Sequence, residues 1–350
     1  MNKIFCLFAC KKARSDADFR SNYIDDQLFE DNKRQSITSN IVILGNEFSG
    51  KNTLITQVKL MASDGLLDGY RLSIREHFFT SIVLNLLQLL REFGTSGLEF
   101  DKSRTFEDAS FVFQNSDQMK RGIISPKVVS ALRNIWQDRP MQTFIKSHIS
   151  QSGASTTYFF SSLDRILRDD FLPSNEDILH IKCGTCSVED EIIFRNGNYF
   201  RFIRAAMMRS SIHKWIQFFE DVDAIIFITS LLGYDSYVER NSKKVRLRDD
   251  MDYFAAICNS NWFTKCTTVF LILNKCDLFQ RKLAITPLKI CFPDYEGTDS
   301  AIEAAKFIQQ RFEALNRCKT KRVYTQIMSI QSDVEAVHQL VEKVIQLTAK

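Results

Sequence analysis

Short runs of consecutive apolar residues recur along the chain, and segments of helical spacing separate many of them. The first run, residues 41–44, ends in a glycine turn, and a helical pattern over residues 52–62 follows. Such runs, bounded by turn residues, are typical of strands buried on both faces. A strand, a glycine turn and a helix in this order predict the start of a β-α unit.

Later apolar runs predict further strands at residues 192–194, 200–203, 224–228, 269–273 and 323–328. Helical spacing appears among the last of these, as in residues 301–315, and again over residues 334–347. Strands that alternate with helices predict an α/β fold with a mostly parallel sheet covered by helices on both faces.

Residues 67–176 follow a different pattern. Apolar residues there recur with helical spacing, for example over residues 82–90 and 128–136, and no strand stands out. An all-helical block is therefore expected to interrupt the α/β domain. We expect three parts, namely an N-terminal segment (1–35), an α/β domain (36–66 and 177–350) and an inserted helical domain (67–176).

The composition fits a globular protein and limits its function. Of the 350 residues, 45% are hydrophobic, which is ample for buried cores, and the length allows two domains. The net charge of +4 is small and no long basic block stands out, so the sequence does not predict nucleic-acid binding. Nine cysteines, an odd number without a framework spacing, indicate free thiols in a reducing compartment. No apolar run is long enough to span a bilayer.

The N-terminus holds two cysteines, Cys6 and Cys10, close to Lys11 and Lys12. Its apolar stretch is too short for a signal-peptide core. Cysteines beside lysines are typical of reversible palmitoylation at an anionic membrane surface. The alternative is a frayed terminus without an anchor. N-terminal myristoylation in its usual form is excluded, because it requires glycine where this chain has Asn2.

A phosphate-binding loop is predicted where the first strand ends, because the motif GxxxxGK[ST] is nearly matched there. In such a loop, backbone N–H groups, a lysine and a helix N-terminus surround phosphate oxygens. The hydroxyl that should bind Mg²⁺ is replaced by Asn52, whose amide oxygen ligates a hard cation more weakly. The predicted nucleotide contacts are Gly45, Glu47, Phe48, Ser49, Gly50, Lys51, Asn52 and Thr53.

A second motif, Asn274-Lys275-Cys276-Asp277, follows the predicted strand at residues 269–273 and matches the NKxD element of GTPases. The carboxylate of Asp277 accepts hydrogen bonds from two N–H donors of guanine that adenine does not offer. At a strand end after a phosphate loop, the motif predicts a guanine-nucleotide site with contacts from Asn274, Lys275 and Asp277. A P-loop kinase, the lesser alternative, has no need for it.

These motifs and four further stretches resemble heterotrimeric G-protein alpha subunits along nearly the whole chain. The stretches are residues 213–220, 223–227, 257–263 and 270–279, and residues 163–166 resemble the end of the family's helical domain. The resemblance implies a Ras-like P-loop GTPase domain with an inserted all-helical domain. It also implies that residues 1–35 contact the membrane and the beta-gamma dimer.

The resemblance implies roles for single residues near the nucleotide. Thr185 falls on the first-switch threonine that ligates Mg²⁺, with Asn52 as a second candidate ligand. Lys182 falls on the family's catalytic arginine, and a lysine keeps the charge but loses the planar fork. Leu179 and Ile330 fall on positions that border the nucleotide.

The family's beta-gamma surface corresponds to the stretch with Lys214, Trp215 and neighbouring phenylalanines. These aromatic residues are equally consistent with an ordinary core. A C-x-x-C pattern, Cys183 and Cys186, overlaps the first switch. Taken alone it suits a metal or redox site, but no second ligand pair stands nearby.

The second switch departs furthest from the family, which has Asp-x-Gly-Gly-Gln where this chain has residues 204–208. Arg204 reverses the charge of an aspartate that helps to hold Mg²⁺, and Met207 replaces a glycine that senses the γ-phosphate. Met208 replaces the glutamine that orients the attacking water, which a thioether cannot do. We therefore expect slow or absent GTP hydrolysis.

Other departures change charges around the phosphates. Glu47 replaces a glycine and Phe48 replaces a glutamate. One hypothesis is that Arg204 partly replaces the charge of Mg²⁺, or pairs with Glu47. Residues 240–248 are basic where the family's third switch is acidic, which fits either a solvated loop or a binding patch. The family's last receptor-contacting turn also has no counterpart after Lys350.

The leading hypothesis is a divergent alpha subunit that binds GTP or GDP with a weakened Mg²⁺ site. Its expected partners are the beta-gamma dimer, a receptor and an effector, at the cytoplasmic face of the plasma membrane. The alternative is a nucleotide-insensitive pseudo-GTPase that binds beta-gamma or another partner, which the intact Lys51 and NKxD element disfavour.

Overall fold

The computed structural model describes most of the chain that follows the N-terminal segment. The described residues are 36–46, 48–62, 68–147, 151–168, 170–181, 189–204, 221–238, 244–260, 263, 266–298 and 300–350.

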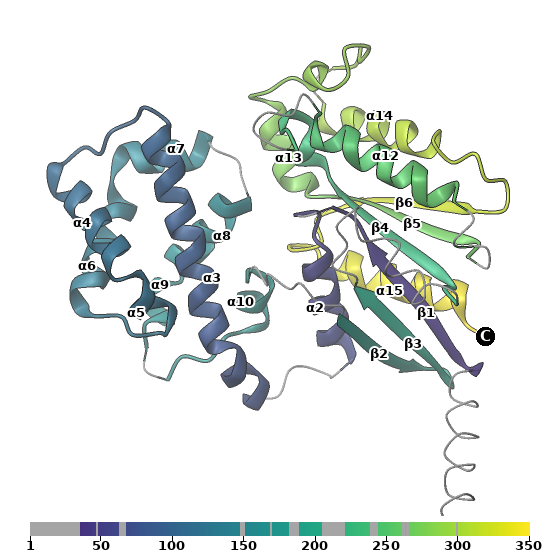
Figure 1. The fold of residues 1–350 in the computed structure, drawn as a ribbon, viewed down its shortest axis with the longest axis horizontal. Helices are drawn as coiled ribbons and strands as arrows, with labels where there is room; N and C mark the ends of the chain where they lie inside the picture. Colours follow the sequence, from purple (N-terminus) through teal and green to yellow (C-terminus); the bar gives the residue numbers. More distant parts are fainter. Residues whose placement is uncertain are drawn as a thin grey trace, which may run out of the picture.

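A six-stranded sheet forms the centre of one half of the protein (Figure 1). Its strands are β1 (Thr38–Leu44), β2 (Glu189–Arg195), β3 (Asn198–Arg204), β4 (Ala224–Ser230), β5 (Thr268–Asn274) and β6 (Arg322–Met328). Their order is β2-β3-β1-β4-β5-β6, and every neighbouring pair is parallel except β2 and β3. The predicted mostly parallel sheet is confirmed.

The antiparallel edge of the sheet comes from a tight hairpin between β2 and β3. Arg195 pairs with Asn198, so the turn consists of Asn196 and Gly197, whose φ angles are 51° and 81°. An Asn-Gly pair with positive φ at both positions suits the twist of a two-residue hairpin. A parallel crossover needs a much longer connection.

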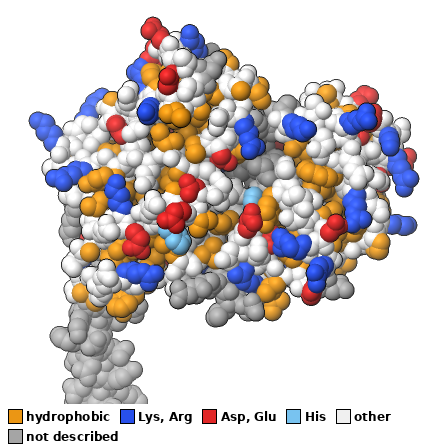
Figure 2. Space-filling model, turned by 180° about the vertical axis from the view of Figure 1, so that it is seen from behind, with side chains coloured by type: hydrophobic (Ala, Val, Ile, Leu, Met, Phe, Trp, Pro, Cys, Tyr) orange, Lys and Arg blue, Asp and Glu red, His pale blue; other side chains and the backbone are white. Residues whose placement is uncertain are grey.

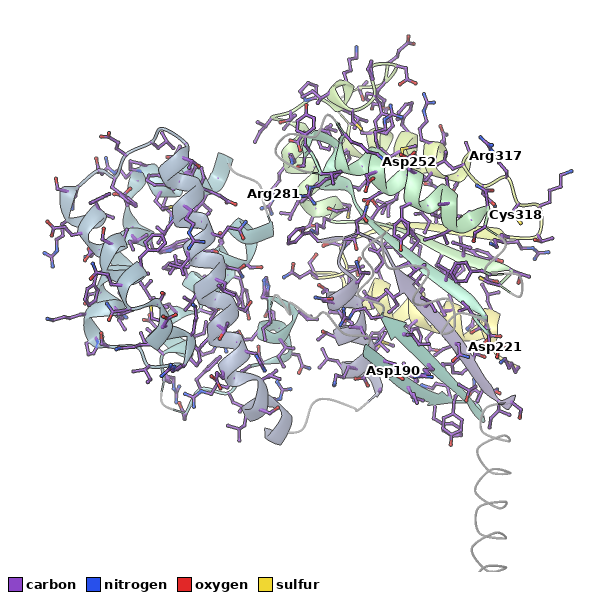
Figure 3. The ribbon with its side chains drawn as sticks, viewed as in Figure 1. Asp190, Asp221, Asp252, Arg281, Arg317 and Cys318 are labelled. Carbon is purple, nitrogen blue, oxygen red and sulfur yellow. The ribbon has the colours of Figure 1, made fainter. Side chains whose placement is uncertain are left out.

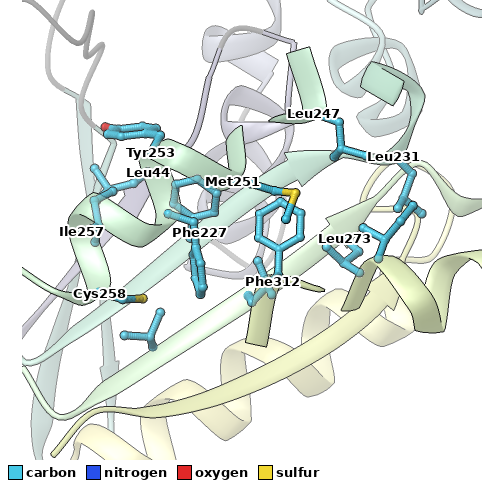
Figure 4. Close-up of a cluster of buried hydrophobic side chains, with 14 of the residues drawn as sticks. Leu44, Phe227, Leu231, Leu247, Met251, Tyr253, Ile257, Cys258, Leu273 and Phe312 are labelled. Carbon is cyan, nitrogen blue, oxygen red and sulfur yellow. The ribbon is translucent and has the colours of Figure 1, made fainter. Parts of the chain in front are cut away.

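Alternate side chains of the central strands supply two cores. Ile41 and Ile43 pack on the face covered by α2 and α15, whereas Val42 and Leu44 pack on the face covered by α12, α13 and α14 (Figure 1). Figure 4 shows part of the second core, which includes Phe227. The helices are α2 (Lys51–Ala62), α12 (Arg246–Cys258), α13 (Cys276–Leu283), α14 (Ala301–Glu313) and α15 (Val334–Thr348), with short 3-10 turns η3 (Leu231–Asp235) and η4 (Leu288–Ile290). Burial on both faces explains the uninterrupted apolar runs.

Helices alone build the other half of the described chain (Figure 1). They are α3 (Asp68–Thr95), α4 (Ser103–Gln114), α5 (Ser116–Lys120), α6 (Pro126–Gln137), α7 (Arg139–Ser147), α8 (Gln151–Ser161) and α9 (Leu163–Ile166). The long helix α3 passes through this half and buries Val83, Leu86 and Leu90 in its core. A short helix, α10 (Asn175–Leu179), lies between these helices and α2. The predicted limits of the two domains stay a prediction.

The C-terminal helix α15 is attached to the start of β1. The Ser39 hydroxyl donates to the Thr348 carbonyl oxygen at 2.6 Å, and the Lys350 ammonium donates to the Thr38 carbonyl oxygen at 2.7 Å. The first strand and the last helix are thus joined across the whole chain length. Within the described residues, no helix combines the length and the apolar character that crossing a bilayer requires.

Candidate functional site

The loop between β1 and α2 has backbone angles that two glycines permit. The φ angle is 143° at Gly45 and 114° at Gly50. A Cβ atom at Gly45 would lie 2.1 Å from the Ile228 carbonyl oxygen, and one at Gly50 would lie 2.3 Å from the Asn274 amide nitrogen. Both the angles and the close approaches exclude larger residues. The two glycines of the motif therefore shape the loop as its sequence predicts.

Polar groups converge on this loop. The Lys51 ammonium donates to the Asn46 carbonyl oxygen at 2.7 Å and also to that of Gly45. The Ser49 hydroxyl is buried and has no hydrogen-bond partner among the described residues. A buried hydroxyl without a partner costs about 1–3 kcal/mol. A phosphate oxygen would satisfy it, so the residues present fit the phosphates of a nucleotide.

The described part of the predicted metal site is the first turn of α2. Asn52 and Thr53 are half-buried in the first turn of α2, where backbone N–H groups lack helical partners. That the side-chain amide of Asn52 binds Mg²⁺ there stays a prediction. An amide carries no charge, so it fits a hard dication less well than a carboxylate.

Asn274 connects the phosphate loop to the predicted base-binding loop. Its amide nitrogen donates to the Ser49 carbonyl oxygen at 2.7 Å, and its Oδ1 accepts from the backbone N–H groups of Lys275 and Ile330 at 2.8 and 2.9 Å. The Lys275 ammonium donates to the Phe48 carbonyl oxygen at 2.5 Å. Both residues therefore brace the site, while Asp277 is exposed in the first turn of α13, open to the donors of a guanine.

Leu179 and Ile330 are buried, and their neighbours join the helical half to the sheet half. The Gln331 amide and the His180 Nδ1 lie 2.7 Å apart, and the Tyr158 ring stacks on the His180 ring with 3.8 Å between centroids. Burial lowers the pKa of His180 to about 4, so the ring is neutral at pH 7 and Nδ1 accepts from the Gln331 amide. The contact places Leu179 and Ile330 at the same junction.

A buried carboxylate network supports the phosphate loop from below. The Asn46 side-chain amide donates to Asp249 Oδ2 at 3.1 Å and also to Asp250 Oδ1. The Thr229 hydroxyl donates to Asp250 Oδ2 at 2.5 Å. Burial raises the pKa of Asp250 to about 6, although hydrogen bonds from Thr229 and Asn46 oppose the shift. The sequence does not predict this network, because its hydrogen bonds join separate segments of the chain.

Arg204 is the one residue of the altered second switch that the structure describes. Its side chain is only 2% exposed. It pairs in register with Ile43, so it lies on the face of the sheet covered by α2, close to where β1 enters the phosphate loop. The positive charge is therefore inside the protein and not on its surface. Its predicted pairing with Glu47 lies outside the described residues.

Two described residues of the basic run at residues 240–248, Lys244 and Arg246, contact other residues of this chain. Lys244 forms ion pairs with Asp249 at 2.9 Å and Asp252 at 2.7 Å. Arg246 donates to the Tyr237 carbonyl oxygen at 2.9 Å, and its guanidinium lies 5.9 Å from the centroid of the exposed Phe48 ring. The interpretation of the whole basic run as a solvated loop or a binding patch stays a prediction, because residues 240–243 lie outside the described residues.

Several predicted site residues lie outside the described residues, and their roles stay predictions. They are Glu47, Lys182, Cys183, Thr185, Cys186, Met207, Met208, Lys214 and Trp215, together with Cys6 and Cys10 of the N-terminal segment.

A comparison with protein families decides between the possible nucleotide-binding folds. The sequence model described as G-protein alpha subunit matches residues 19–348. The chain belongs to the G-protein alpha subunit family. As a family, G-protein alpha subunits bind guanine nucleotide and Mg²⁺, associate with beta-gamma dimers, receptors and effectors, and typically work at the inner face of the plasma membrane.

Membership of the G-protein alpha subunit family confirms the resemblance inferred from the motifs and accounts for both halves of the fold. Against that background, the network of Asn46, Thr229 and Asp250 and the contact of His180 with Gln331 are the features that motif searching overlooks. A weak signal was present in the adjacent acidic residues Asp249 and Asp250, which are followed by the apolar positions of α12 from Met251 onwards.

Proposed function

We propose that this alpha subunit binds GTP and GDP between its sheet half and its helical half, as a signal transducer that hydrolyses GTP slowly or not at all. The observation that carries the proposal is the bracing of the phosphate loop by Asn274 and Lys275, which also hold the base-binding loop. These hydrogen bonds hold the predicted phosphate loop and the predicted base-binding loop in a fixed relative position, which nucleotide binding requires.

Slow hydrolysis follows from the side chains at the second switch. Catalysis of phosphoryl transfer to water needs a group that orients the water and a charge that stabilises the transition state. Met208 supplies no hydrogen bond, and Lys182 replaces an arginine fork with a point charge. We further propose that a beta-gamma dimer contacts Lys214 and Trp215, and that Cys6 and Cys10 anchor the chain to the membrane.

The direct test is the affinity for fluorescent GTP and GDP analogues, measured with and without Mg²⁺. Replacing Lys51 with alanine is expected to weaken binding about 10- to 100-fold, as for the loss of one hydrogen bond from a charged group. Lys59→Ala is the matched control, because Lys59 lies on the same helix but pairs with Glu191 on β2 at 2.8 Å. Its affinity should equal that of the unchanged protein.

A nucleotide-insensitive pseudo-GTPase is the second candidate, and the buried Arg204 favours it. The positive charge of Arg204 lies beside the phosphate loop whether or not a nucleotide is bound. It can therefore stabilise the loop electrostatically, as a bound metal ion would. Absence of binding under every condition, with normal folding, would establish this candidate and exclude the first.

A further inference from the structure

Asp250 is a buried carboxyl group with no role in the nucleotide contacts described above. It lies in the second turn of α12 and is 5% exposed. Its two oxygens accept hydrogen bonds from different elements, Oδ1 from Asn46 in the phosphate loop and Oδ2 from Thr229 at the end of β4. The carboxyl group therefore ties the loop to the sheet and to α12 at once.

The charged groups around Asp250 come from the same elements. Lys51, at the start of α2, lowers its proton affinity, and Asp249, its neighbour on α12, raises it. Asp249 is itself paired with Lys244 at 2.9 Å. From β4 the facing group is the uncharged Thr229. The positive charge that most favours an ionised Asp250 thus belongs to the lysine of the phosphate loop.

We propose that Asp250 is a positioning residue of the phosphate loop and that it takes up a proton from solvent when a nucleotide polyphosphate binds beside Lys51. This inference rests on the proposed nucleotide binding and deepens it. Binding brings negative charge to Lys51, cancels the positive potential at Asp250 and adds a repulsive one. Two negative groups then share one buried site, and protonation of the carboxyl removes the conflict.

Proton uptake and nucleotide binding are thermodynamically linked, so each changes the affinity for the other by the same factor. If binding draws a proton onto Asp250, then adding protons strengthens binding by the same factor. Nucleotide affinity should therefore rise as the pH falls from 8 towards 6, once the opposing loss of negative charge from the terminal phosphate of the nucleotide is corrected for. Asp250 remains outside the contact shell of the ligand and acts through Asn46 and the potential at Lys51.

The experiment compares the full-length protein with Asp250→Asn, an isosteric variant that carries no charge. Calorimetric binding of GTP and GDP at pH 7, in two buffers of different ionisation enthalpy, yields the number of protons taken up. We expect the unchanged protein to take up about half a proton or more beyond Asp250→Asn. At pH 8 the variant should bind about tenfold more tightly because a nearby negative charge is gone.

Asp252→Asn provides the matched control. Asp252 lies on the same helix (Figure 3), pairs with Lys244 at 2.7 Å and has a 64% exposed side chain. The substitution Asp252→Asn removes the same charge at a position that does not contact the phosphate loop. Proton uptake by this variant should therefore match that of the unchanged protein. Thr229→Val serves as a second variant. The hydroxyl donor lowers the pKa of Asp250, so without it more of the carboxyl group is protonated before binding and uptake on binding should fall.

Three outcomes are distinguishable. A difference in proton uptake confined to Asp250→Asn and Thr229→Val supports the proposal. Nucleotide binding with equal proton uptake in all four proteins overturns the coupling while leaving the proposed function intact. No binding by any of them, with cooperative unfolding preserved, overturns both.

Discussion

Single residues in this protein divide into those that face a ligand and those that hold the ligand-facing parts in place. Asn274 belongs to the second group, because its side chain forms hydrogen bonds with the backbone of Ser49, Lys275 and Ile330. We propose that Asp277 belongs to the first group, since its side chain is exposed at the start of α13. A substitution at each type of position should therefore change a different quantity.

Replacing Asp277 with alanine should remove the preference for guanine. Two hydrogen bonds that base N–H groups donate to the carboxylate are lost, which is expected to reduce the ratio of GTP to ATP affinity on the order of 100-fold. Competition of both nucleotides against a fluorescent GTP analogue measures this ratio. An equal loss of affinity for GTP and ATP would show that Asp277 contacts no base.

Arg204 should make nucleotide binding partly independent of metal. Its buried charge lies on the α2 face of the sheet near the phosphate loop. Adding EDTA is therefore expected to weaken GTP binding less than about tenfold in the unchanged protein, but far more in Arg204→Gln, which keeps polar bulk without the charge. Strict Mg²⁺ dependence of the unchanged protein would refute this compensation.

Among the helices and strands, the sequence predicted best those strands that are buried on both faces of the sheet. The strands β1, β4 and β5 are buried on both faces, so their apolar runs left no doubt about type or position. The hairpin of β2 and β3 was predicted as two strands without its direction. Helix α12 escaped specific prediction because buried acidic residues, Asp249 and Asp250, interrupt its apolar pattern.

The candidate site was predictable only where one continuous motif supplies it. Gly45, Gly50 and Lys51 lie within a few residues of each other, and local chemistry explains their spacing. Asn46 and Asp250 are 204 residues apart, and a hydrogen bond over such a separation leaves no local pattern. The same holds for His180 and Gln331, which are 151 residues apart.

The junction between α10 and the loop after β6 should slow nucleotide release. His180→Ala removes the hydrogen bond from Gln331 and the stacking on Tyr158. Together these contacts are expected to slow dissociation about 5- to 30-fold, so GDP should leave faster from the variant. Stopped-flow displacement of a fluorescent GDP analogue measures the rate. Gln331→Ala alone should give a smaller effect, and the double variant should exceed His180→Ala only slightly. Unchanged release would place the nucleotide away from this junction.

On the whole molecule, charges of both signs are interspersed over the face shown in Figure 2, with hydrophobic side chains between them. Surface pairs of this kind, such as Arg168 with Asp170, contribute little to stability. The pH dependence of stability should instead come from the buried groups whose pKa values are displaced, chiefly His180 and Asp250.

These two groups should act in opposite directions on acidification. The pKa of His180 is lowered to about 4, so the stability that its neutral form provides is present above pH 6.5 and is lost as pH falls towards 4. The pKa of Asp250 is raised to about 6, so its contribution is complete below pH 3.8 and is lost as pH rises through 6. Each effect amounts to at most about 3 kcal/mol.

Urea unfolding of the nucleotide-free protein between pH 4 and pH 8 separates the two effects. Asp250→Asn should gain stability relative to the unchanged protein above pH 6, and His180→Gln should lose less stability below pH 6. Parallel pH profiles for all three proteins would mean that neither group is titrated by folding.

The hydrogen bonds of Asp250 also make its two donors depend on the carboxylate. A buried carboxylate without donors is costly, whereas a threonine hydroxyl or an asparagine amide beside a small uncharged residue is tolerated more easily. Removing Thr229 or Asn46 alone should therefore destabilise the protein more than removing that donor together with the carboxylate. These three side chains, distant in sequence, are thus expected to be exchangeable only as a set.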